Sequence, residues 1–67
     1  MKHPLRKFRE RQGLSREELA IRLGVTGMTV YRWEAGQRMP RQKHWPKIKE
    51  VANVTPVQML KHAERVA

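Results

Sequence analysis

The chain of 67 residues is predicted to be one domain (residues 1–67), small enough to bury only ~60% of the surface that it exposes when unfolded. Its 15 Lys and Arg against six acidic residues leave a formal net charge of +9, which favours a nucleic-acid partner over acidic proteins or a lipid surface. Cysteine is absent and no apolar run nears the ~20 residues of a membrane span, so we expect an intracellular protein without disulfides, transmembrane helix or signal peptide.

Apolar residues recur at spacings of three and four along the chain, and alternating strand patterns are missing, so we predict five short helices. The first begins at Pro4 and continues to about Gln12, where Gly13 provides a left-handed end. Leu5 and Phe8 form its inward side.

The second helix begins with a capping box, in which the Ser15 hydroxyl accepts the Glu18 N–H and the Glu18 side chain reaches back. Leu14 and Leu19 flank this start as a hydrophobic staple. Gly24 ends the helix. The predicted buried stripe consists of Leu19, Ala20 and Leu23.

The third helix repeats this arrangement, with Thr26 as N-cap and a staple between Val25 and Val30. It is predicted to extend over residues 27–35 and to stop at Gly36. Only about three residues separate it from the second helix, and two helices joined by so tight a turn usually cross steeply, at ~90–120°.

The fourth helix is expected to begin near His44 rather than directly after Pro40, because Pro46 resists a helix interior. Its inward residues are Ile48, Val51 and Ala52, and Asn53 tolerates the left-handed conformation at its end.

The fifth helix begins at Thr55 to Gln58, a capping box with proline at the first helical position, and Val54 and Met59 form its staple. Val57, Leu60 and Ala63 are its expected inward residues. An apolar edge of Leu60, Ala63 and Val66 is open to two interpretations, a cover on the core or a contact between two copies.

The third helix has two different sides when its residues are placed ~100° apart. Val30 and Trp33, about 60° apart, define the core side. Met28, Tyr31 and Ala35 lie opposite, with Arg32 and Gly27 at the flanks. A major groove about 12 Å wide admits such a helix, and Arg32 has the two donors that guanine O6 and N7 accept.

The segment "LRKFRERQGLSREELAIRLGVTGMTVYRWEAGQRMP" resembles the Cro- and phage-repressor-like (Xre) helix-turn-helix family. The similarity extends from Leu5 to the "VTPVQML" of the fifth helix, and its most specific pieces are "GLSREELA", "LGVT" and "WEAG". It implies an all-α, five-helix, lambda-repressor-like domain, with a helix-turn-helix unit at about residues 15–35. It also implies a bacterial or phage-encoded regulator in the bacterial cytoplasm that binds a two-fold DNA operator as a homodimer.

The resemblance assigns roles to particular residues. Base contacts fall on Thr26, Gly27, Met28, Tyr31 and Arg32. Phosphate contacts fall on Arg16, where the family commonly has Gln, and on Arg38, Arg41 and Lys43. The family also has a polar or charged side chain where this chain has Gly27, and it rarely has the "HWP" of residues 44–46.

Glu34 lies beside the core stripe of a helix that must approach negative phosphates. An unpaired carboxylate there would cost folding and binding free energy, so we predict a cationic partner. Arg9 occupies the ion-pair position of the family. The alternative is a solvated Glu34 without a fixed partner.

The sequence contains no pattern that is typical of a catalytic or metal site. The three histidines, His3, His44 and His62, lie on separate predicted elements without cysteine or carboxylate at ligand spacing. No nucleophile with its base and no phosphate-binding glycine loop is recognisable, so we expect neither an enzyme nor a cofactor. The leading hypothesis is a sequence-specific double-stranded DNA-binding regulator, a repressor or Cro-like protein. The alternatives are an antitoxin-like protein-interaction module and a non-specific DNA or RNA binder.

Overall fold

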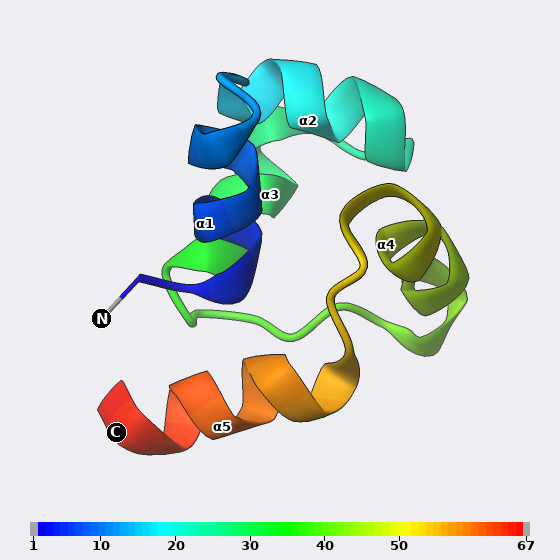
Figure 1. Ribbon diagram of the computed structural model, residues 1–67. Helices are drawn as coiled ribbons and strands as arrows, with labels where there is room; N and C mark the ends of the chain where they lie inside the picture. The colour runs from blue at the N-terminus through cyan, green and yellow to red at the C-terminus, as the bar shows by residue number, and fades with distance from the viewer. Residues whose placement is uncertain (1, 67) are drawn as a thin grey trace.

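The helices begin and end close to the residues that the sequence marks for these positions. The computed structural model describes the backbone of residues 2–66 and the side chains of residues 2–62. These residues contain five α-helices and no strand, which confirms the predicted all-α fold (Figure 1). The helices are α1 (Pro4–Arg11), α2 (Arg16–Leu23), α3 (Gly27–Glu34), α4 (Trp45–Ala52) and α5 (Pro56–Val66), with a 3-10 helix η1 (Gln42–His44) before α4.

Side-chain caps stabilise the N-termini of α2 and α3. Ser15 Oγ accepts the Glu18 N–H at 3.1 Å, and Glu18 Oε1 accepts the Ser15 N–H at 2.8 Å. At α3, Thr26 Oγ1 accepts the Thr29 N–H at 3.2 Å. Because each cap satisfies donors that the helix itself leaves free, it contributes about 1 kcal/mol to the helix. Both predicted caps are confirmed, as is the capping box between Thr55 and Gln58 in α5.

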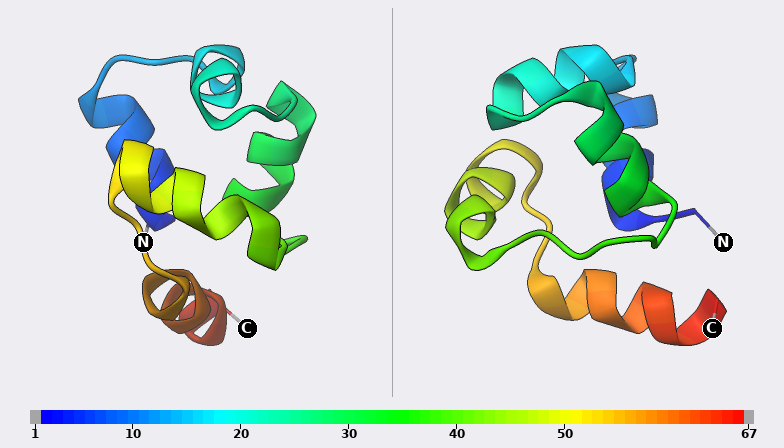
Figure 2. Two further views of the ribbon diagram at one scale, coloured as in Figure 1. Left: turned by 90° about the vertical axis from the view of Figure 1, so that its right-hand side faces the viewer. Right: turned by 180° about the vertical axis from the view of Figure 1, so that it is seen from behind.

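The turn between α2 and α3 determines the direction in which α3 leaves. Gly24 adopts φ 73°, a left-handed conformation that favours glycine, and Thr26 already caps the next helix. The three residues between the helices are therefore enough to change the direction of the chain, and α3 crosses α2 at a steep angle (Figure 2, right). The two helices pack directly against each other.

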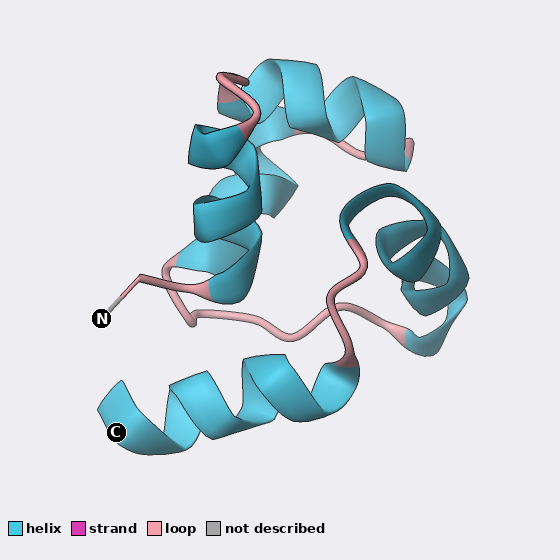
Figure 3. Ribbon diagram, viewed as in Figure 1, coloured by secondary structure: helices cyan, strands magenta, loops and turns pink. Residues whose placement is uncertain are grey.

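A loop without regular structure leads from the end of α3 to η1 and crosses the molecule (Figure 3). Pro40 is the buried residue of this loop. The start of α4 follows the prediction, since Pro46 lies in the first turn, where its missing N–H costs no helical hydrogen bond. Asn53 ends α4 with φ 55°.

The core lies where α1, α2 and α3 meet α4 and the beginning of α5. The residues predicted to face inward from α2 and α3 are all buried. Phe8 and Val51 are only partly buried and pack against the edge of the core. The buried apolar residues are Leu5, Leu19, Ala20, Leu23, Val30, Trp33, Ile48, Ala52, Val54 and Met59.

The inward side predicted for α5 was wrong. Val57 and Leu60 are 58% and 53% exposed, whereas Met59 and His62 are buried. The staple between Val54 and Met59 decides this, because residues 57 and 60 lie ~160° and ~100° around the helix from residue 59. A helix held by Met59 therefore directs Val57 and Leu60 outward. The side chains of Ala63 and Val66 lie outside the described residues.

Two histidines that are far apart in the sequence meet between α1 and α5. The rings of His3 and His62 contact each other edge to face, with their centroids 5.1 Å apart. His3 is 4% exposed, and its Nδ1 accepts the Leu5 N–H at 3.1 Å, so it caps α1. Burial and the neighbouring His62 lower the pKa of His3 to about 4.

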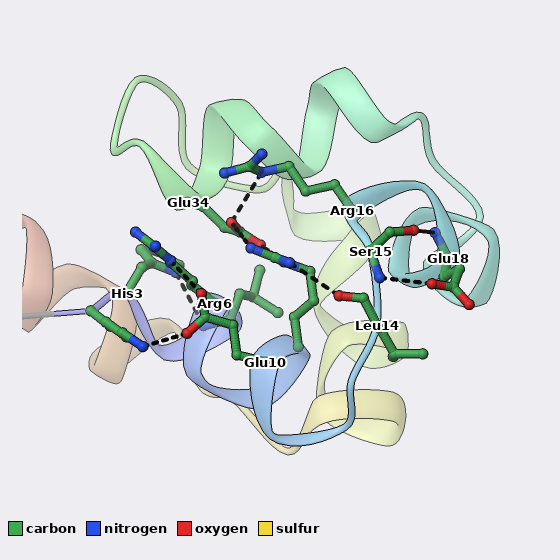
Figure 4. A network of polar contacts seen from close by, with 11 residues as sticks. His3, Arg6, Glu10, Leu14, Ser15, Arg16, Glu18 and Glu34 are labelled. Atoms are coloured by element: carbon green, nitrogen blue, oxygen red, sulfur yellow. Dashed lines mark hydrogen bonds and ion pairs between the residues drawn. The ribbon is translucent and has the colours of Figure 1, made fainter.

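A buried carboxylate joins the first three helices. The Glu34 side chain is 3% exposed, and Arg9 donates to both of its oxygens, from Nε at 2.8 Å and from Nη2 at 3.1 Å. Arg9 Nη1 also donates to the Leu14 carbonyl at 3.0 Å. Arg16 Nε approaches the same carboxylate at 3.3 Å (Figure 4). The predicted ion pair between Arg9 and Glu34 is therefore present, and Arg16 extends it to α2.

Replacing Glu34 by Gln is expected to destabilise the fold by about 3 kcal/mol, because Arg9 would lose its counter-charge in a nearly dry site. Denaturant unfolding followed by circular dichroism measures this change. Glu10→Gln is the control, since Glu10 pairs with Lys2 and Arg6 on the exposed side of α1. Equal unfolding midpoints for the two variants would contradict a structural role of the buried pair.

Stability is expected to fall as the pH decreases from about 6.5 to about 4, because unfolded His3 takes up a proton in this range and folded His3 does not. This shift sets an upper limit of roughly 3 kcal/mol on the loss of stability, because solvent screens part of the effect. His3→Asn keeps an acceptor for the Leu5 N–H and removes the titration. The free energy of unfolding, measured at several pH values in this range, should therefore change less with pH in the variant than in the wild type. An equal change in both proteins would disprove the assignment to His3.

Candidate nucleic-acid interface

The two sides of α3 have opposite environments. Val30, Trp33 and Glu34 are buried, with exposed fractions between 0 and 9%. Met28 and Tyr31 are 57% and 42% exposed. Arg32 is exposed beside them. Since a short helix cannot turn about its axis without removing Trp33 and Glu34 from the core, these outward residues are held in one orientation.

Two threonines form hydrogen bonds at the N-terminal tip of α3. The Thr26 hydroxyl lies 2.9 Å from the Thr29 hydroxyl, in addition to accepting the Thr29 N–H. Thr26 is exposed, and Gly27 is half-buried. The first N–H groups of any helix lack acceptors within the helix, so the tip presents backbone donors and the positive end of the helix dipole.

A cleft beside α3 brings together four of the predicted DNA-contacting residues. The chain after α3 folds back, with the Gln37 N–H donating to the Arg32 carbonyl at 3.0 Å. This return places the loop and η1 along one flank of α3. We call the resulting hollow, of about 220 Å³, the basic cleft. It is lined by Thr29, Arg32, Trp33, Arg38, Met39, Arg41, Lys43 and His44.

The basic cleft has the chemistry of an anion site. Its lining contains four Arg and Lys side chains and no carboxylate. Two of its polar residues, Thr29 and His44, were not among the predicted DNA contacts. On the helical wheel Thr29 lies between the core residue Trp33 and the outward residue Arg32. Its position on the wheel therefore does not show whether it faces the core or the surface. His44 packs its ring 5.4 Å from that of Trp33, a contact between distant residues that no local pattern indicates.

Arg16, assigned to a phosphate by the family pattern, has further contacts. Its Nε donates to Glu34, and its guanidinium carbon lies 5.1 Å from the centre of the Tyr31 ring. A cation over an aromatic face is an attractive arrangement. Arg16 therefore links α2 to the outward face of α3 and restrains Tyr31, while its side chain remains 40% exposed.

A larger hollow of about 480 Å³ lies between α1, the end of α4 and the first half of α5. Its lining also contains four Lys and Arg side chains and no carboxylate, but none of its lining residues belongs to α3. Residues 2–62 contain no group of three or more potential metal ligands. Every buried polar side-chain atom among the described residues has a hydrogen-bond partner. None of the described helices combines the length and apolarity of a membrane span.

Comparison with known proteins gives one match. A family model described as helix-turn-helix matches residues 5–59, from the start of α1 to the middle of α5. No curated protein and no solved structure matches the chain. The matched region contains all the residues that we assign to the interface. The chain therefore belongs to the Cro- and phage-repressor-like helix-turn-helix family of DNA-binding regulators, and its five helices form the lambda-repressor-like fold of that family.

Proposed function

We propose that the protein is a sequence-specific transcriptional regulator, of repressor or Cro type, that inserts α3 into the major groove of double-stranded DNA. The observation that carries this proposal is the position of the basic cleft along one flank of the exposed side of α3. A helix in the groove has phosphate backbones on both sides, so cations at its flank meet phosphates while its outer face meets bases. We place its action in the bacterial cytoplasm, on chromosomal or phage DNA.

Base readout is assigned to the outward face of α3. Arg32 donates to guanine O6 and N7, and Met28 contacts a thymine methyl group. Tyr31 contacts a base edge or a phosphate. Because Arg16 already restrains the Tyr31 ring in the free protein, the ring loses less conformational entropy when DNA binds. Thr26 and Gly27 bring the tip of α3 close to the DNA.

Phosphate contacts are assigned to Arg38, Arg41 and Lys43 in the basic cleft, and to Arg16 from α2. These contacts determine the register of α3 and carry no sequence information of their own. Because each neutralised phosphate releases counterions, affinity falls steeply as the salt concentration rises. Nothing in this role requires a metal, a cofactor or an enzymatic step.

We further propose that two copies bind a two-fold operator, with recognition helices about one DNA turn, ~34 Å, apart. The outward position of Leu60 supports the second interpretation of the α5 edge, a contact between copies, because this side chain does not cover the core. Val57, also exposed on α5, would add apolar surface to such a contact. The rival function, a protein-interaction module with little DNA contact, predicts that random-site selection enriches no duplex.

Arg32→Ala is expected to abolish the preference for guanine at one operator position, at a cost of ~1–3 kcal/mol there, and to retain most of the non-specific binding. Arg41→Ala, the matched control in the basic cleft, should weaken all sequences alike and reduce the slope of log K against log salt by ~1. Fluorescence anisotropy with single-base-pair operator variants measures both effects. An equal loss on all sequences for Arg32→Ala would exclude base readout by Arg32.

Leu60→Glu is expected to weaken binding to the complete operator and to leave binding to a half-site unchanged, because the added charge would repel the second copy. Gln58→Glu adds the same charge to α5 and keeps the capping-box chemistry with Thr55, so it is the control. Titrations on full and half operators, combined with the mass of the complex, measure the difference. Identical behaviour of the two variants would argue against α5 as the contact.

A further inference from the structure

Gly27 is a glycine at a position where the space is already occupied. A β-carbon built on Gly27 would lie 3.1 Å from Glu17 Oε1 and 3.2 Å from Glu17 Cγ. The three atoms nearest to such a β-carbon all belong to the Glu17 side chain, which comes from the first turn of α2. The side chain of Glu17 therefore fills the volume that a side chain at residue 27 would pass through.

The carboxylates of Glu17 and its neighbour Glu18 differ in their contacts. The Glu18 carboxylate accepts the Ser15 N–H in the capping box (Figure 4). Glu17 is exposed, and among the described residues its carboxylate has no cation within 4 Å. Since Gly27 begins α3 at the edge of its outward face, the Glu17 carboxylate lies over the tip of the proposed recognition helix.

A carboxylate at this place needs a donor in the complex. It has the same sign as the phosphates, and its position next to a helix that enters the groove brings it close to the DNA. An ionised carboxylate only accepts hydrogen bonds. The major groove offers amino donors at cytosine N4 and adenine N6, and glutamate pairs best with cytosine N4, whereas guanine presents the acceptors N7 and O6.

We propose that Glu17 is a specificity-determining residue that replaces the missing side chain of Gly27 and selects cytosine at one base pair of each half-site. This inference rests on the proposed function, because it assumes that α3 lies in the major groove. The contact also accounts for the glycine, because a β-carbon at position 27 would crowd the Glu17 side chain and require it to move by a few tenths of an ångström. Thus α2 supplies the carboxylate that contacts the base, and Gly27 of α3 leaves the space that this carboxylate occupies.

Random-site selection on the full chain tests the proposal, followed by affinities for the selected operator and its single-base-pair variants. The wild type should select cytosine at a position absent from the Glu17→Gln profile. In the variant, discrimination against the other bases there should decrease tenfold or more, with a gain for adenine, because an amide pairs with adenine N6 and N7. Glu18→Gln makes the same charge change one residue away and retains the capping box, so its profile should match the wild type.

Gly27→Ala provides an independent test that leaves the carboxylate in the chain. Its β-carbon must move Glu17 by a few tenths of an ångström, so the same cytosine preference should weaken. The effects of Gly27→Ala and Glu17→Gln should not add in the double variant, because both act on one contact. Unfolding midpoints of all variants establish that each is folded.

Three results would overturn the inference. An unchanged base profile for Glu17→Gln would show that Glu17 reads no base. A uniform gain in affinity on every sequence, without a change of preference, would show that Glu17 only repels phosphates. If wild type and Glu18→Gln both select no sequence, the proposed function itself fails, and this outcome differs from a failure of Glu17 alone.

Discussion

The hydrogen-bonded ion pair between Arg9 and Glu34 is the constraint on which the arrangement of the proposed DNA-contacting residues depends. The carboxylate sits at the end of α3 and is almost fully buried, so breaking the pair would leave a charge in a nearly dry site. Arg9 connects it to α1 and to the Leu14 carbonyl, and Arg16 connects it to α2. Two helices, α1 and α2, thus hold α3 at one angle of rotation, and that angle determines which of its residues face outward.

A helix of eight residues contributes to the core and, in the proposed function, to the DNA interface as well. Trp33 and Val30 supply its apolar anchor, and Glu34 adds a polar anchor whose geometry is more demanding than that of packing alone. The same network reaches the outward face, because the guanidinium of Arg16 contacts both Glu34 and the Tyr31 ring. Folding and the proposed recognition of DNA therefore share side chains, and Arg16 belongs to both.

The tip of α3 illustrates a second kind of sharing. Gly27 has no side chain, and the side chain of Glu17, from α2, lies in the space beside it. On the opposite flank, the loop after α3 turns back and brings Arg38 and Arg41 beside Arg32. The surface proposed to meet DNA is thus composed of three segments, with α3 at its centre. Its charge is mixed, since one carboxylate lies among several cations, which favours discrimination between base pairs over uniform attraction to phosphate.

Features that depend on neighbours a few residues apart could be predicted from the amino-acid sequence. The caps at Ser15, Thr26 and Thr55, the tight turn at Gly24 and the division of α3 into two sides all follow from local hydrogen bonds and helical periodicity. Tertiary structure decided what depends on distant contacts: the meeting of His3 with His62, the basic cleft, and the position of Glu17 over Gly27. The orientation of α5 lies between these cases, because the staple of Val54 and Met59 indicated it and the apolar spacing of Val57 and Leu60 indicated the opposite. Periodicity shows that a helix has an apolar stripe, and only packing against the other helices selects which stripe is buried.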